Sequence, residues 1–170
     1  TFVIVGRLEF MKNHAFLIKI VNELREYDFQ LKIVGSGVLE KSLKSMVSEL
    51  HLNEKIEFLG ARTDVPKILK NCECMLLPSL WEAFPIVLLE AAACNIPVIT
   101  TPVGSISSLV DNENGYIVEL DIFKDTMIEV LENYSVAKNK SKNLFKKVNT
   151  NFQIKDIVSQ YETLYDALIE

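Results

Sequence analysis

Short apolar runs alternate with amphipathic segments along the whole chain. The apolar runs are nearly continuous in hydrophobic residues, which is typical of strands that are buried on both faces of a parallel sheet. We expect strands at Phe2–Val5, Leu31–Val34, Ile56–Leu59, Met75–Leu77, Val98–Thr100 and Tyr116–Val118. The segments between and after them predict helices at Ala15–Arg25, Leu39–His51, Asp64–Lys70, Ile86–Ala93, Ile122–Asn133, Val136–Lys147 and Ile154–Ile169.

This alternation predicts an α/β fold, a doubly wound, Rossmann-like parallel sheet with helices on both faces. In such sheets the ligand crevice lies at the C-terminal ends of the strands. The loops that should carry function are therefore Gly6–His14, Gly35–Val38, Gly60–Asp64, Pro78–Pro85 and Thr101–Ser108. The last predicted helix has one apolar face, which must pack on this domain or on a neighbour.

Composition supports one globular domain over residues 1–170, since 49% of the 170 residues are hydrophobic and 24% are charged. The formal net charge of -5 argues against a nucleic-acid partner. No run has the length and apolarity of a membrane span, and the N-terminus lacks a signal-peptide pattern. Because the chain is inside an apolar run by Phe2, we expect it to be one domain of a longer protein.

The three cysteines, Cys72, Cys74 and Cys94, form no Cys-x-x-Cys pair. Free buried thiols in a reducing compartment are the favoured interpretation. No spaced set of Cys and His residues predicts a metal site, so we expect none.

Glu82 and Glu90 are the most informative residues, because they lie eight positions apart across a predicted strand-to-helix corner. Two carboxylates there can accept several hydroxyl hydrogen bonds, and a sugar nucleotide supplies such hydroxyls. A carboxylate in an apolar helix needs partners. For Glu90 a bound ribose diol and a buried salt bridge or helix-capping role are equally compatible with the sequence.

Two cations follow the first predicted strand, Arg7 directly and Lys12 five positions later. One interpretation of these two cations is an anion site. On loop position alone, a pair of solvated surface cations is somewhat favoured. Gly35 and Gly37 follow the second strand and allow a ligand to approach the backbone, although an ordinary turn explains them equally well. Position 40 is Glu40, so no dinucleotide fingerprint is complete and a dehydrogenase is disfavoured.

Two other features have plainer interpretations. His14 stands at a helix start, where a structural role is favoured over a catalytic one. A group of lysines could contact anionic lipid, but a solvated helix face is favoured. These lysines are Lys138, Lys140, Lys142, Lys146 and Lys147.

In order along the chain, the motifs resemble the donor-binding half of a retaining glycosyltransferase of the GT-B fold, family four, also called glycosyl transferases group 1. The matching pieces cover nearly the whole sequence. They are Val5-Gly6-Arg7-Leu8 with Lys12-Asn13-His14, Ile33-Val34-Gly35-Ser36-Gly37, Phe58-Leu59-Gly60, the Glu-x7-Glu signature from Leu77 to Ala93, Asn95–Ile99 and Asn114–Val118.

The resemblance implies a role for each matching residue. Arg7, Lys12 and Glu82 would be the catalytic set: the two cations would bind the donor diphosphate, and Glu82 would contact the transferred sugar. Glu90 would hold the ribose hydroxyls. Further donor-binding groups would lie at Gly35, Gly37, Ala61 and Arg62 near the base and ribose, and at Ala83, Phe84 and Pro85 near the sugar and phosphates.

The chain also departs from the family pattern. Asn13 replaces a glycine of the family pattern. A positive φ is less favourable for Asn than for glycine, but Asn can adopt it. Ala83 and Pro85 replace the glycines of the common Glu-Gly-Phe-Gly form, and Pro85 suits the first turn of a helix. The Gly-Gly-x-x-Glu that usually follows the fifth strand reads Gly104-Ser105-Ile106-Ser107-Ser108, without its glutamate.

The family resemblance implies transfer of a sugar from a nucleotide sugar, with a UDP-linked donor favoured, with retention and without a metal or other cofactor. The acceptor would be a saccharide or lipid-linked molecule, bound mainly by an absent N-terminal domain, in cell-surface polysaccharide or glycolipid synthesis. The setting would be the cytoplasm, with peripheral contact at the inner face of the membrane possible. A nucleotide-sugar epimerase of the same fold and a non-catalytic nucleotide-binding subunit are the alternatives.

Overall fold

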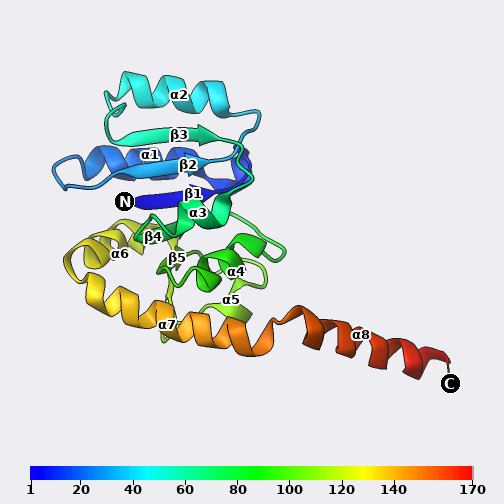
Figure 1. Cartoon of the computed structure of the whole chain (residues 1–170). Coiled ribbons are helices and arrows are strands. Elements are labelled where there is room, and N and C mark those ends of the chain that lie inside the picture. The colour runs from blue at the N-terminus through cyan, green and yellow to red at the C-terminus, as the bar shows by residue number, and fades with distance from the viewer. Residues whose placement is uncertain (170) are drawn as a thin grey trace.

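A single parallel sheet organises the chain in the computed structural model, which describes residues 1–169. The strand order is β3-β2-β1-β4-β5-β6 (Figure 1). The strands are β1 (Phe2–Val5), β2 (Leu31–Val34), β3 (Ile56–Gly60), β4 (Cys74–Leu77), β5 (Val98–Thr100) and β6 (Tyr116–Ile117). The doubly wound α/β fold and all the predicted strands are confirmed, with their ends correct to within one residue.

The predicted helices are also present, and two of them, α4 and α8, have the predicted bounds. The helices are α1 (His14–Glu23), α2 (Glu40–Glu49), α3 (Val65–Leu69), α4 (Ile86–Ala93), α5 (Ile106–Leu109), α6 (Leu120–Glu132), α7 (Tyr134–Asn151) and α8 (Ile154–Ile169). The sequence analysis missed α5 and the 3-10 turn η1 (Phe10–Lys12), because elements of one turn leave no hydrophobic period to detect.

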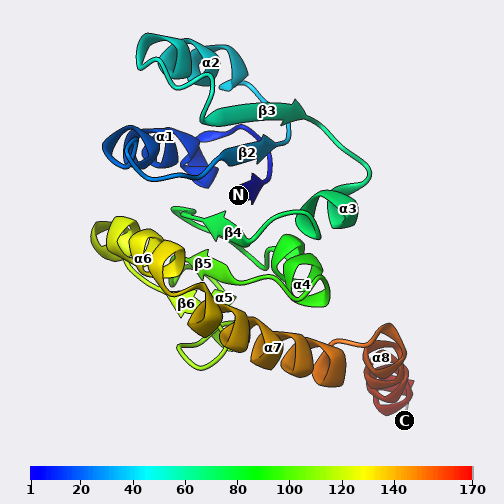
Figure 2. The same ribbon diagram turned by 60° about the vertical axis from the view of Figure 1, so that its left-hand side comes forward.

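Two cores lie on opposite faces of the sheet, because successive strand side chains point to opposite sides. Phe2 and Ile4 of β1 pack with α1, α2 and α6, whereas Val3 packs with α3, α4, α5 and α7. The helices accordingly form a layer on each side of the sheet (Figure 2). Each layer is closed by fully buried side chains such as Leu17 and Leu88, so residues 1–153 contain a complete α/β core.

The strand order reverses between β1 and β4. The chain proceeds outward from β1 to β3, returns to the middle, and then proceeds the other way from β4 to β6. β1 and β4 pair only at Phe2 with Cys74 and at Val3 with Met75, and their last residues have no ladder partner across this line. The loops that follow these two strands therefore diverge, which opens the crevice typical of a topological switch point.

Cys72, Cys74 and Cys94 are free thiols, as expected, although Cys94 is only half-buried. Burial raises the pKa of the Cys74 thiol. Among the described residues, the structure contains no helix with the length and apolarity needed to cross a bilayer.

The last helix, α8, extends beyond the layered body (Figures 1 and 2). Every side chain from Val158 to Leu168 is exposed, so the apolar face predicted from the sequence has no cover within the described chain. Its exposed members are Ile154, Val158, Tyr161, Leu164, Tyr165 and Leu168. Large exposed apolar faces promote association.

We predict that ending the chain at Gln153 removes self-association without weakening the fold. The shortened chain retains Phe152, whose ring stacks on Phe84 with centroids 6.0 Å apart, and both cores. Its thermal midpoint should stay within a few degrees of the parent value, while sedimentation velocity should show a smaller associated fraction. A large fall in the midpoint would mean that α8 belongs to this core.

Candidate functional site

An ion pair joins the two loops that diverge at the switch point. Lys12 Nζ lies 2.5 Å from Glu82 Oε1, and the two side chains are only 13% and 6% exposed. Next to this pair, the backbone N–H of Leu80 donates to the carbonyl of Met11 at 2.8 Å. The loop after β1 and the loop after β4 are therefore fixed to each other at the carboxyl edge of the sheet.

The Glu82 carboxylate is held from both sides of the crevice. Ser79 Oγ donates to Glu82 Oε1 at 2.7 Å, and Thr101 Oγ1 donates to the carbonyl of Ser79 at 2.6 Å. The second oxygen, Oε2, accepts no hydrogen bond from any described residue. One carboxylate oxygen is thus committed to the protein and the other is available to a hydroxyl group.

The loop after β5 packs directly on the backbone of this corner. Gly104 adopts φ +59, and a Cβ built there would lie 1.8 Å from the carbonyl oxygen of Glu82. The hydroxyl and the backbone N–H of Ser105 both donate to the carbonyl of Ala83. Although the glutamate expected in this loop is absent, the glycine and serine place the peptide that carries Glu82.

A cavity of about 210 Å³ lies beside the ion pair, at the ends of β1, β2 and β3. Several residues predicted to bind the donor line it together: Arg7, Gly35, Ala61 and Arg62, with Gly6, Ser36 and Val65 among their neighbours. The remaining predicted residues of the Glu82 corner lie across the switch point. The structure thus brings the predicted residues to one edge of the sheet, in two adjoining groups.

Gly35 lines this cavity, whereas Gly37 lines a separate hollow beside α2, and both glycines have a packing cause. A Cβ on Gly35, which has φ +141, would lie 1.9 Å from the carbonyl oxygen of Gly6. A Cβ on Gly37 would meet the backbone of Leu8 at 2.6 Å. Close approach of two loops, which the sequence cannot distinguish from close approach of a ligand, is therefore sufficient to require both glycines.

Each predicted cation has a carboxylate partner in the ligand-free chain. Arg7 Nη1 lies 3.0 Å from Glu9, and the Arg7 side chain is 73% exposed. Arg62 makes a two-point contact with Asp64, at 2.8 and 2.9 Å. These hydrogen bonds lower the pKa of the Asp64 carboxyl and raise that of the Arg62 guanidinium. Arg7 and Lys12 lie on the same loop, but Arg7 pairs with Glu9 and Lys12 pairs with Glu82.

Glu90 lies on the half-buried face of α4. One turn further along that face, Cys94 Sγ lies 3.6 Å from the carbonyl oxygen of Pro66, so this face of α4 meets α3. The Glu90 carboxylate makes no hydrogen bond or ion pair with any described side chain. The salt bridge considered as its structural role is thus absent from the described chain, and Glu90 does not line the cavity at the ends of β1, β2 and β3.

The helix α4 begins directly after the Glu82 corner. Buried Pro85 is its N-cap residue, and Leu88 donates to the carbonyl of Pro85 at 3.0 Å. The first amides of any helix lack internal acceptors and favour an anion. Of the neighbouring predicted residues, Ala83 and Phe84 are exposed at the surface of the corner.

His14 is buried beneath this site as the first residue of α1, with 1% exposure. Neither ring nitrogen has a hydrogen-bond partner among the described residues. Burial, with a smaller effect of the nearby Lys12 charge, lowers the pKa of His14 to about 4. Asn13 precedes it with φ 56, so the left-handed conformation considered at the replaced glycine is adopted.

Sequence reasoning missed the residues that hold the predicted ones in place. Glu9, Asp64 and Ser79 supply their polar partners, and Gly104 allows the close contact with Glu82. Glu9 and Asp64 each lie two positions from the arginine that they bind, so the proximity of opposite charges was a usable signal. The contact between Gly104 and Glu82 joins separate loops and has no local signal.

Most of the lysines of α7 have partners in the protein. Lys138 donates to the carbonyl of Asn95, and Lys140 donates to that of Asn112 and lies over the ring of Tyr116. Lys147 pairs with Asp111 at 3.2 Å. These contacts fix α7 to the sheet and to its loops, and they leave little of the lysine group as an unengaged basic surface.

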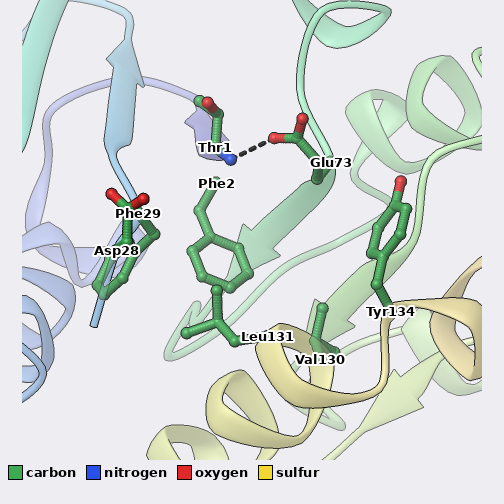
Figure 3. Close-up of a pocket in the computed structure, with 8 residues that line it drawn as sticks. All are labelled: Thr1, Phe2, Asp28, Phe29, Glu73, Val130, Leu131 and Tyr134. Atoms are coloured by element: carbon green, nitrogen blue, oxygen red, sulfur yellow. Dashed lines mark hydrogen bonds and ion pairs between the residues drawn. The ribbon is translucent and has the colours of Figure 1, made fainter.

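A separate pocket of about 170 Å³ lies at the opposite, amino edge of the sheet (Figure 3). Phe2, Phe29 and Val130 provide apolar walls, and the ammonium group of Thr1 pairs with Glu73. None of the residues predicted to bind a donor lines this pocket, so the candidate site is the carboxyl edge.

The fold and this edge define a doubly wound α/β domain with a polar crevice at its topological switch point. A family model for glycosyl transferases group 1 matches residues 1–147. The chain belongs to the glycosyl transferases group 1 family, and the predicted resemblance is confirmed at that level.

Two curated relatives illustrate the similarity. N-acetyl-alpha-D-glucosaminyl L-malate synthase of Bacillus anthracis is 35% identical over 86% of this chain and 39% of its own length. The UDP-Gal:alpha-D-GlcNAc-diphosphoundecaprenol alpha-1,3-galactosyltransferase of Escherichia coli is 33% identical over 99% of this chain and 46% of its own length. The chain thus spans less than half the length of each.

Solved structures show the same fold. HepE of Anabaena, crystallised in complex with UDP, superposes with a TM-score of 0.90 at 21% identity, covering 98% of this chain and 48% of HepE. The C-terminal domain of LpcC, a glycosyl transferase group 1 protein from Francisella tularensis, gives 0.81 at 24% identity, covering 90% of this chain and 86% of that domain. The second case shows that a domain of this fold crystallises on its own.

We predict that Gly104→Ala destabilises the chain more than Gly60→Ala. Both glycines have positive φ, so both substitutions strain the backbone, but only the Cβ at 104 meets another atom, whereas nothing lies within 4 Å at 60. The free energy of unfolding from urea titrations should fall by about 1–3 kcal/mol more for Gly104→Ala. Equal losses would show that the loop after β5 adjusts without cost.

We also predict that the stability of the chain falls as the pH falls from 6.5 towards 4. In this window the unfolded state protonates His14 and the folded state does not, since its pKa is lowered from 6.5 to about 4. The unfolded state therefore binds more protons, and the loss should reach roughly 3 kcal/mol. His14→Leu should flatten this part of the profile of unfolding free energy against pH, and an unchanged profile would contradict the assignment.

Proposed function

We propose that the chain is the donor-binding half of a retaining glycosyltransferase. In this proposal it binds a UDP-linked nucleotide sugar for transfer of a hexose to a saccharide or lipid-linked acceptor. One observation carries the proposal. The Lys12–Glu82 pair adjoins the cavity that is lined by Arg7, Gly35, Ala61 and Arg62. A charged corner adjoins a nucleoside-sized cavity at the switch point, where α/β sheets bind ligands.

The distances suggest how the donor is held. The Lys12 ammonium has three donors, and one serves Glu82, so two remain for diphosphate oxygens. The diphosphate also gains from the first amides of α4. Glu82 Oε2 accepts a hydroxyl of the sugar, and the unpartnered Glu90 carboxylate accepts the ribose diol. Arg62 and the backbone at Gly35 and Ala61 face the base and ribose.

The chemistry assigned to these residues is electrostatic. When the bond from sugar to diphosphate breaks, negative charge develops on the departing diphosphate. A fixed ammonium stabilises that charge without reorganising at the moment of reaction. Arg7 adds a second positive charge once it leaves Glu9. The proposal therefore assigns leaving-group stabilisation to side chains, without a metal ion, and it assigns no protein nucleophile.

The remaining parts of the reaction belong to the rest of the protein. We propose that an N-terminal domain binds most of the acceptor across the cleft and excludes water, so the isolated chain should bind a nucleotide without transferring sugar. The printed name of the E. coli relative, with its diphosphoundecaprenol acceptor, supports a lipid-linked acceptor. Action at the inner face of the cytoplasmic membrane would follow from such an acceptor.

Two alternatives are less well supported. A nucleotide-sugar epimerase would need an acid–base pair of its own beside the sugar, and Glu82 is already paired with Lys12 and Ser79. A non-catalytic subunit would not need the full set of Arg7, Lys12, Glu82 and Glu90 that the carboxyl edge retains. The donor-binding enzyme therefore remains the function that the geometry supports best.

We predict that calorimetry will show binding of one nucleotide among UDP, GDP and ADP, and that Glu90→Gln will weaken it. Losing charge-assisted bonds to the ribose should cost on the order of 1.5–3 kcal/mol, which is roughly a tenfold to hundredfold loss in affinity. Glu119→Gln, on the loop before α6, is the matched control and should bind like the parent. Unchanged affinity with a lowered thermal midpoint would favour a purely structural Glu90.

A further inference from the structure

Two exposed aromatic rings lie against each other at the rim of the candidate site. Phe10 in η1 is 69% exposed, and Trp81 in the loop after β4 is 52% exposed. Their ring centroids are 6.0 Å apart and the planes are inclined by 46°. Exposed single apolar residues are common, but a pair from two loops forms a patch, and patches mark binding surfaces.

The position of this pair is fixed by the same contacts that build the corner. Phe10 lies two residues before Lys12, and Trp81 directly precedes Glu82. The hydrogen bond from Leu80 to Met11 joins the two loops between these positions. In each loop the charged side chain is buried while the ring, one or two residues away, is exposed, so the rings lie nearer the solvent than the Lys12–Glu82 pair.

The chemistry of this surface fits a sugar ring. A pyranose has an apolar C–H face that can cover an aromatic ring, and hydroxyls around its edge that need polar partners. The indole N–H of Trp81 donates to no described residue. In the adjacent Glu82, Oε2 accepts no hydrogen bond from a described residue. A lipid surface would call for unengaged basic residues around the rings, and the nearest cation, Lys12, is already paired.

The layering distinguishes the two sugars of the reaction. The donor's sugar is assigned to Glu82, in the inner layer next to the nucleotide cavity. A ring that stacks on Phe10 and Trp81 lies outside that layer, on the solvent side of the reacting bond. We propose that Phe10 and Trp81 form an aromatic platform for a pyranose ring of the acceptor saccharide. This inference rests on the proposed function, because it takes the inner layer as the donor site.

The chain supplies its own reporter, because Trp81 is its single tryptophan. The experiment uses residues 1–170 saturated with UDP-glucose and follows Trp81 emission during titration with methyl α-D-glucopyranoside, methyl α-D-galactopyranoside and methyl N-acetyl-α-D-glucosaminide. At least one should change the emission in a saturable way, with a dissociation constant in the millimolar range. Sorbitol, which has hydroxyls but no ring face, should give no saturable change.

Matched variants test the platform itself. Phe10→Ala keeps the reporter and should weaken glycoside binding roughly threefold to tenfold, since it removes one aromatic contact. Tyr161→Ala removes a ring of similar exposure, 56%, on α8 and should have no effect. Trp81→Ala, followed by ligand-observed NMR, should weaken the same glycoside. Both platform variants should bind UDP like the parent, because the nucleotide cavity is untouched.

Several results would overturn the inference. If UDP binds and no glycoside does, the platform is wrong while the proposed function stands. If none of UDP, GDP and ADP binds, the proposed function fails. A glycoside response seen with UDP but abolished by UDP-glucose would assign the platform to the donor's sugar. A response to anionic phosphatidylglycerol vesicles alone would assign it to a lipid surface. A Phe10→Ala loss of thermal stability confined to the full-length protein would assign it to contact between domains.

Discussion

The ion pair between Lys12 and Glu82 joins the loops that follow β1 and β4, where the ladder between these two strands has already ended. β1 and β4 pair only over their first residues, so their carboxyl ends separate and the following loops are free to diverge. The pair crosses this gap with both side chains largely buried. Removing one partner of a buried pair leaves an uncompensated charge and costs about 3–5 kcal/mol. The Glu82 corner and the aromatic rings of Phe10 and Trp81 lie on the two loops that this pair joins.

Much of the fold could be predicted because the central strands β1, β4 and β5 are buried on both faces and therefore apolar along their length. Phe2–Val5 is an unbroken apolar run and Leu31–Val34 is interrupted only by Lys32, and their bounds are those of β1 and β2. Helix ends were harder: α7 was predicted as Val136–Lys147 and extends over Tyr134–Asn151, because its buried positions continue to Val148 beyond the lysine-rich stretch. One-turn elements such as α5 depend on loop packing and leave no periodic pattern.

The site could be predicted as a set of loops but not as a set of contacts. Strand ends in a parallel sheet meet at one edge, so placing Arg7, Gly35 and Glu82 on that edge needed only the fold. Their partners depend on how the loops cross. Gly35 fits against Gly6, and Gly104 against Glu82, over separations that no local spacing encodes. The sequence therefore identified candidate groups, whereas side-chain packing decides which atoms remain available.

The paired state of the cations has a consequence for selectivity. Lys12, Arg7 and Arg62 each face a carboxylate, so none of these three cations presents an unbalanced positive charge. A small anion must compete with Glu82, Glu9 or Asp64 for a cation, and its charge is the only interaction that it supplies. A nucleotide sugar brings a base, a ribose and a sugar ring, whose contacts can offset the loss of an internal pair. Under the proposed function, the carboxylates at this edge would therefore favour extended, multi-point ligands over simple phosphate.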